Sequence, residues 1–116
     1  MSNAGSPKEA LRTLSRRAHV RYRCDRQPSR RVFLVESYRT FFAEVHDLST
    51  SGVGLLLDRP LALGALLFVD LLGLDVPVEH LARVVHATPG ENGRYLIGCE
   101  FDHPLAQEEL TTVLAR

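Results

Sequence analysis

The sequence has few cysteines and shows none of the residue spacings typical of metal sites and active sites. It has two cysteines, Cys24 and Cys99, which lie far apart and match neither a zinc spacing nor a redox pair. Its five histidines form no ligand pattern such as His-Glu-x-x-His. No nucleophile with a matching base can be recognised by spacing. We therefore expect no metal site, no catalytic residues and no enzymatic activity.

Long apolar runs are also missing. No run reaches the roughly 18 apolar residues that a membrane helix needs. No basic-then-apolar start resembles a secretory signal. A chain of 116 residues with 45% hydrophobic residues suits one soluble domain with a modest core. We expect a cytoplasmic protein that does not insert into a membrane.

Charge is unevenly distributed along the chain, although the formal net charge is zero. Residues 1–40 hold ten basic side chains against three acids, a balance of +7, and residues 41–116 hold four arginines against eleven acids, a balance of −7. This division favours an anionic partner for the basic segment, or else a segment that lies on the acidic body and neutralises it. Residues 16–31 carry much charge and little apolar surface, so we expect them to be mobile without a ligand.

Short β-rich segments separated by turn signals make up most of the chain. This spacing favours an antiparallel barrel or sandwich, and there is no alternation of strands with helices. The six expected strands cover residues 32–36, 41–48, 53–57, 65–72, 76–87 and 94–101.

Two helices are expected at the ends of the chain. Residues 1–15 form an extension in which a Ser-Pro-Lys-Glu capping pattern predicts a short helix over about 7–15. Near the other end, Pro104 is expected to open a helix capped by Asp102 or His103. The apolar residues of this helix recur at helical spacing and form one stripe of Ala106, Leu110, Val113 and Leu114.

Two motifs suggest a function. Arg17 and Arg21 form an Arg-x-x-x-Arg pattern within residues 16–23, which contain four arginines. After a further 25 residues, Asp47, Ser49 and Gly52 form an Asp-x-Ser-x-x-Gly pattern between two expected strands. Taken alone, the second pattern is explained by a hairpin turn, because Asp, Ser and Gly all favour turns.

In this order and at this spacing, the two motifs resemble those of the PilZ domain family, which are bacterial receptors for cyclic di-GMP. Residues 94–101 look like the last strand of that family, with Gly98 and Phe101 in a Gly-x-x-Phe ending. The resemblance runs from about residue 16 to residue 114, and we assign residues 16–116 to a PilZ-like domain. It implies a mainly β protein: a six-stranded antiparallel barrel with a C-terminal helix and a mobile basic N-terminal segment. It also implies a non-enzymatic receptor that binds cyclic di-GMP, needs no cofactor, and signals by ordering its N-terminal loop.

The resemblance also assigns the site residues. It implies that Arg17 and Arg21 hold guanine and phosphate, and that Asp47, Ser49 and Gly52 form the facing turn. Arg16 occupies a position that in this family influences whether one ligand or a stacked pair binds.

The chemistry of these residue types agrees with the assignment. A guanidinium fork donates two parallel bonds to phosphate or to guanine O6 and N7, and its plane stacks on a base. Asp47 is suited to accept from guanine N1 and N2, and Gly52 permits close approach of backbone and ligand. Ser49 has three open partners: phosphate, guanine, or its own turn.

Two other binding functions are left open. One is a PilZ-like adaptor that binds protein but no nucleotide, and the intact motifs argue against it. The other is nucleic-acid binding through the arginine-rich segment, which lacks interleaved aromatic residues and overall basicity. A downstream protein partner is expected, but the sequence does not identify it.

Overall fold

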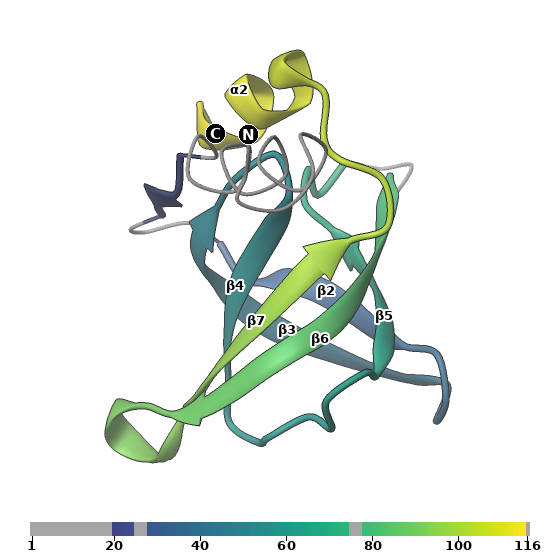
Figure 1. The fold of residues 1–116 in the computed structure, drawn as a ribbon, viewed down its shortest axis with the longest axis vertical. Coiled ribbons are helices and arrows are strands. Elements are labelled where there is room, and N and C mark those ends of the chain that lie inside the picture. Colours follow the sequence, from purple (N-terminus) through teal and green to yellow (C-terminus); the bar gives the residue numbers. More distant parts are fainter. Residues whose placement is uncertain (1–19, 25–27, 75–77, 116) are drawn as a thin grey trace, which may run out of the picture.

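A computed structural model describes residues 20–24, 28–74 and 78–115 of the chain. In this part the chain is mainly strand, with one α-helix near the C-terminal end (Figure 1). The strands are β1 (Tyr22–Arg23), β2 (Arg30–Leu34), β3 (Arg39–Leu48), β4 (Gly52–Leu57), β5 (Leu66–Asp70), β6 (Glu79–Pro89) and β7 (Tyr95–Phe101). The helix is α2 (Gln107–Leu114), and a 3₁₀ turn, η1 (Glu91–Gly93), joins β6 to β7.

The strands form one closed antiparallel barrel. The order across the sheet is β1-β3-β2-β5-β6-β7-β4, and pairing of β3 with β4 closes it. Strands β2 to β7 make up the barrel, which confirms the six-stranded barrel predicted from the sequence. The short strand β1 pairs with the last two residues of β3, beyond the part of β3 that pairs with β2.

Alternation along each strand separates the core from the outer surface. On β4, Val53, Leu55 and Leu57 are buried in the hydrophobic core. The residues between them, which include Gly54 and Leu56, therefore belong to the outer face. The same alternation on β7 buries Ile97, Cys99 and Phe101. The paired strands β4 and β7 thus both contribute side chains to the core.

Some predicted strand bounds were wrong, for identifiable reasons. Strand β5 ends at Asp70 instead of residue 72, because the Asp70 carboxylate accepts a hydrogen bond from Gly73 N at 3.1 Å and stabilises a turn. Strand β2 begins at Arg30, two residues before the prediction, because Arg30 already pairs with Ala43 of β3. Strand β6 continues to Pro89, two residues past the prediction, because it stays paired with β7 up to Tyr95.

The C-terminal helix packs on the barrel as predicted but begins later. Helix α2 starts at Gln107, so the predicted start at Pro104 with Asp102 or His103 as the cap is wrong. The first turn is held instead by Glu109, whose Oε1 accepts from Ala106 N at 3.0 Å. Leu110 and Val113 are buried, which confirms most of the predicted apolar stripe, and Leu114 packs partly against the core. Ala106 is exposed.

The expected helix over residues 7–15 lies outside the described residues, as do residues 16–19 and 25–27 of the segment expected to be mobile. Among the residues that are described, no helix is long and apolar enough to cross a bilayer.

Candidate ligand-binding site

The turn between β3 and β4 is built by its own serine and glycine. Ser49 N donates to Gly52 O at 2.9 Å, and Ser49 Oγ accepts from the backbone N–H groups of Ser51 and Gly52, both at 3.2 Å. Ser49 is fully buried, at 0% exposure. The sequence left three partners open for the Ser49 hydroxyl. In the structure its partner is the backbone of its own turn.

Gly52 is required by a close approach between strands. A Cβ atom at this position would lie 2.3 Å from the carbonyl oxygen of Cys99 on β7, nearer than real Cβ contacts come. Any side chain here would push β4 away from β7. Both Ser49 and Gly52 thus shape the turn that carries Asp47 to the outer surface.

Asp47 joins the two sequence motifs. Its Oδ1 atom accepts a hydrogen bond from Arg21 Nη1 at 2.5 Å, and its Oδ2 atom lies 2.7 Å from His46 Nδ1. This places Arg21 of the first motif in direct contact with the second motif. The contact forms because β1 pairs with the end of β3, where Arg23 stands opposite Asp47.

A row of four outward-facing residues crosses four strands of the barrel. Asp47 on β3 stands opposite Gly54 on β4, Gly54 opposite Gly98 on β7, and Gly98 opposite His86 on β6. A Cβ on Gly54 would lie 2.4 Å from Asp47 Oδ2, and one on Gly98 would lie 2.1 Å from His86 Nε2. The carboxylate and the imidazole therefore each lie over a glycine, and both glycines are buried.

Two irregularities in strand register aim these side chains. The pairing of β3 with β4 shifts between Val45 and Asp47, and that of β6 with β7 shifts between Val84 and His86. Such bulges reorient a side chain and are common beside functional sites. The sequence-based prediction missed Gly54, Gly98 and His86 as site residues, although a glycine inside a strand is a known sign of close approach.

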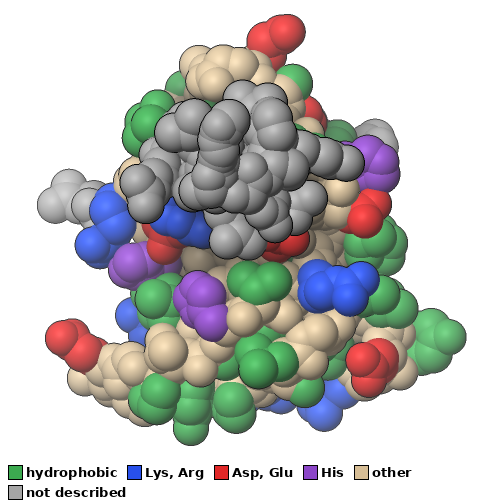
Figure 2. Space-filling model, in the orientation of Figure 1, with side chains coloured by type: hydrophobic (Ala, Val, Ile, Leu, Met, Phe, Trp, Pro, Cys, Tyr) green, Lys and Arg blue, Asp and Glu red, His purple; other side chains and the backbone are tan. Residues whose placement is uncertain are grey.

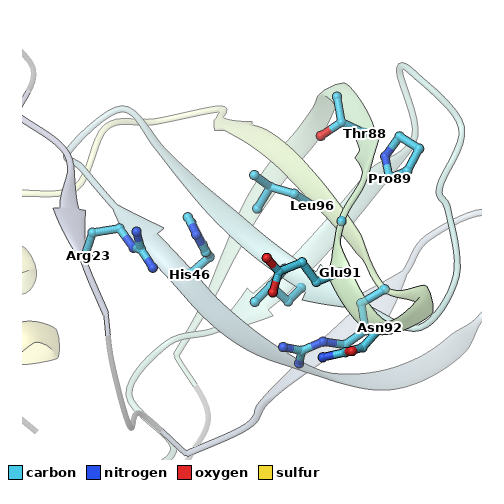
Figure 3. Close-up of a pocket in the computed structure, with 10 residues that line it drawn as sticks. Arg23, His46, Thr88, Pro89, Glu91, Asn92 and Leu96 are labelled. Atoms are coloured by element: carbon cyan, nitrogen blue, oxygen red, sulfur yellow. The ribbon is translucent and has the colours of Figure 1, made fainter.

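A groove continues from this row along the same strands. It has a volume of about 410 Å³, within the range of ordinary small-molecule sites, which is roughly 300–1,000 Å³. Figure 3 shows Arg23 and His46 at one side of it, Thr88 and Pro89 at the other, and Leu96 and Glu91 between them. Leu56 pairs with Leu96 and adds apolar surface. The groove thus combines apolar and basic side chains with the carboxylate of Glu91.

The surroundings of the groove are mixed in charge. Arg94, which also lines it, forms an ion pair with Glu44 of β3. In the space-filling view, histidine and basic side chains lie on the face formed by β4, β7 and β6, among hydrophobic side chains (Figure 2). In the described part of the chain, no group of three His, Cys, Asp or Glu residues is suitably placed to hold a metal ion.

The predicted site residues fall into three groups. The structure brings Arg21 and Asp47 into contact and places Ser49 and Gly52 in the adjoining turn. Arg16 and Arg17 lie outside the described residues.

Comparisons with known proteins agree with this fold. A family model for the PilZ domain matches residues 15–115. The PilZ domain of YcgR from Escherichia coli, solved with c-di-GMP, is 17% identical, with a TM-score of 0.61, over 86% of this chain and 89% of that one.

Two longer proteins contain a similar fold. MrkH, described as a c-di-GMP-dependent transcription regulatory factor, is 16% identical with a TM-score of 0.54, over 80% of this chain and 46% of its own. The Bacillus subtilis inhibitor of motility MotI/DgrA is 15% identical with a TM-score of 0.54, over 84% of this chain and 47% of its own. The chain thus spans about half the length of these two proteins.

A search of the curated proteins found no match to this chain. At 15–17% identity, the solved structures establish a common fold. The family model extends over nearly the whole chain, and the closed barrel is that of a solved PilZ domain. The chain therefore belongs to the PilZ domain family.

Proposed function

We propose that this chain is a non-enzymatic cytoplasmic receptor for cyclic di-GMP that acts on a downstream protein partner. Membership of the PilZ family supports the ligand class, as does a similar PilZ domain solved with c-di-GMP. The observation that carries the proposal is the contact between Arg21 and Asp47, whose carboxylate lies over Gly54 on the outer side of the barrel.

The Arg21–Asp47 pair is suited to be shared with a ligand. The Arg21 side chain is 53% exposed, and an ion pair of this kind contributes only about 0–1 kcal/mol to stability. A phosphate or guanine can therefore compete for the guanidinium at little cost. A carboxylate has about four lone-pair positions, so Asp47 can accept from guanine while it keeps its bond to His46.

Each motif residue then has a role. Arg17 and Arg21 donate paired hydrogen bonds to phosphate and guanine, and Arg16 adds a third guanidinium. Asp47 accepts from guanine N1–H and N2–H. Ser49 and Gly52 hold the turn that presents Asp47, and a ligand meets them through the backbone of that turn.

The row of Asp47, Gly54, Gly98 and His86 supplies the groups that a base meets. Because Gly54 and Gly98 have no side chains, the Asp47 carboxylate and the His86 imidazole can lie close against the barrel. The His86 imidazole forms the far wall and is placed to contact the base. Base–aromatic stacking of this type is worth about 1–3 kcal/mol per base.

The energies are sufficient for a useful affinity. Each charge-assisted hydrogen bond is worth about 1.5–3 kcal/mol. Three or four such bonds, reduced by the cost of ordering the segment and immobilising the ligand, leave roughly the −8 kcal/mol of a micromolar site. Ligand binding would order the N-terminal segment over the barrel, and this ordering is the signal in our proposal.

The direct test is calorimetric titration of the full chain with cyclic di-GMP. We expect binding, and we expect Arg17→Ala and Arg21→Ala each to raise the Kd at least tenfold, which is about 1.4 kcal/mol. Arg→Lys at either position should also weaken binding, because a point charge cannot replace a planar fork. Arg39→Ala is the matched control, since Arg39 is exposed and lies at the opposite end of β3 from Asp47.

Two results would count against the proposal. Unchanged affinity in both alanine variants would contradict the site, and no binding by the wild-type chain would favour the protein-only adaptor. The signalling step is tested by hydrogen exchange over residues 16–31 with and without ligand. Strong protection in both states would show a preformed segment that cannot serve as a switch.

A further inference from the structure

Arg30, the first residue of β2, is a buried charge without a partner among the described residues. It is only 6% exposed, and its side chain makes no hydrogen bond or ion pair with any described residue. Arginine stays protonated in proteins and carries five N–H donors. A buried guanidinium without acceptors is much less favourable than one in water. This position therefore calls for an acceptor.

The Arg30 guanidinium reaches the turn that follows β5. A Cβ on Gly73 would lie 2.3 Å from Arg30 Nη1, so the guanidinium lies against the bare backbone of this glycine. Gly73 also has a φ of +64°, a conformation that glycine adopts without strain. Beside them is a cleft of about 180 Å³, which we call the Arg30 cleft and which Ser29, Arg31 and Asp70 also line.

The acid nearest in the cleft is already engaged. Asp70 Oδ1 accepts from Gly73 N at 3.1 Å, and Asp70 Oδ2 accepts from Arg31 Nη2 at 3.4 Å. Asp70 and Arg31 neutralise each other, so the described residues that line the Arg30 cleft keep a net charge of +1 from Arg30. Glu79 stands opposite Asp70 in the sheet but is not among the residues lining the cleft.

Two exposed apolar side chains lie beside the polar groups of the Arg30 cleft. Phe42 and Leu74 line it and are 69% and 43% exposed. The cleft is smaller than the roughly 300 Å³ at which ordinary small-molecule sites begin, and it is too small for a nucleotide. Its volume suits one carboxylate on a short stem. Arginine with an exposed aromatic neighbour is the composition typical of the energetic centre of protein interfaces.

We propose that the Arg30 cleft binds the carboxylate of an acidic side chain or chain terminus of a protein partner, whose adjacent apolar residue packs on Phe42 and Leu74. The guanidinium fork donates two parallel bonds to the two carboxylate oxygens. This surface is separate from the nucleotide groove. The cleft and the groove share no lining residue, and β2–β5 lies across the barrel from β4–β7.

The test is an NMR titration of the full chain with blocked dipeptides. The probes are N-acetyl-Phe-Asp-amide and N-acetyl-Asp-Phe-amide, their Asn counterparts as neutral isosteres, acetate and phosphate. We expect at least one acidic dipeptide to shift the Arg30 side-chain Nε–H and Gly73 amide resonances saturably. Its Kd should be at least tenfold lower than that of its Asn counterpart. No shift with any acid would show that water satisfies Arg30 and would overturn the proposal. Phosphate binding as tightly as the dipeptides would also overturn it, in favour of a general oxyanion site.

Variants separate a binding role from a structural one. Arg30→Met should abolish the dipeptide response and raise the thermal midpoint, because it replaces an unpaired buried charge with an apolar chain of similar length. A lower midpoint would show that the guanidinium serves the fold, contrary to the proposal. Arg31→Met is the matched control and should lower the midpoint, because it leaves Asp70 with one partner fewer.

Two further measurements keep the proposal independent of folding and of the nucleotide site. Phe42→Ser changes an exposed residue, so the variant chain should fold. This substitution should weaken dipeptide binding severalfold and leave acetate binding unchanged. Equal dipeptide affinity would show that Phe42 is no part of the docking surface. Arg30→Met should bind cyclic di-GMP with wild-type affinity, so this inference and the proposed nucleotide function stand or fall separately.

Discussion

Gly54→Ala tests how the glycine row positions the Asp47 carboxylate. The added methyl carbon would lie 2.4 Å from Asp47 Oδ2, whereas ordinary contacts begin at 3.4 Å, so the carboxylate must withdraw by about 1 Å. Its bonds to Arg21 and His46 are 2.5 and 2.7 Å long. A withdrawal of this size takes them past the limit of a useful hydrogen bond.

The expected effect on binding follows from what the displaced carboxylate loses. A charge-assisted bond from guanine to Asp47 is worth about 1.5–3 kcal/mol. Gly54→Ala should therefore raise the Kd for cyclic di-GMP at least tenfold. Stability should change less, because alanine in a strand interior is about 0.5–1 kcal/mol better than glycine, and this offsets part of the clash.

The assay is a double-mutant cycle measured by calorimetry on the wild type, Gly54→Ala, Asp47→Ala and the double variant. If Gly54 acts through Asp47, the double variant binds no more weakly than Asp47→Ala alone, which gives a coupling energy of about 1.4 kcal/mol or more. Circular dichroism and thermal melting of each variant confirm that it is folded. Additive effects would refute this reasoning, because they would show that Gly54 acts independently of the Asp47 carboxylate.

Three further predictions concern the ligand face and the core. His86→Ala should raise the Kd for cyclic di-GMP at least fivefold, because stacking on a base is worth about 1–3 kcal/mol. His86→Phe should restore binding. Equal affinity in the wild type and both variants would mean that the ring does not contact the ligand. Arg16 should allow two stacked ligands per chain, because a third guanidinium offsets repulsion between phosphates. Titration at protein concentrations well above the Kd should give a molar ratio near two, and Arg16→Leu should reduce this ratio toward one. A wild-type ratio of one would contradict this role. Cys99 is buried, and burial raises the pKa of its thiol from 9.0 to about 12, so the folded chain should resist alkylation there at pH 8. Because the thiol ionises at lower pH in the unfolded chain, the free energy of unfolding should fall between pH 9 and pH 12. Rapid labelling of native Cys99, detected by mass spectrometry, would contradict its burial.

The local pattern of the sequence was sufficient for the kind of fold and the main motifs. Short β-rich segments separated by strong turn signals indicated six strands, because this spacing is typical of antiparallel barrels and sandwiches. The apolar stripe of the last helix was also readable, since Leu110 and Val113 recur at helical spacing and are buried. The spacing of the two motifs indicated the family, which the family model confirmed.

Element ends were less predictable, because single hydrogen bonds and long-range pairings decide them. The helix begins at Gln107 because the Glu109 side chain accepts a hydrogen bond from Ala106 N. The local sequence pattern did not favour this start over one at Pro104. Strand β5 stops at Asp70 because its carboxylate is used by the following turn.

The remainder of the site depends on register, which only the tertiary structure decides. Gly54 and Gly98 lie far apart in the sequence, and two bulges were needed to align them with Asp47 and His86. A shift of one residue would have turned each side chain to the other face. The sequence by itself determined which chemical groups the chain carries and on what kind of element. Closure of the barrel decided that Ser49 serves its own turn and that two glycines leave room for the side chains of Asp47 and His86, because both depend on how closely neighbouring strands approach.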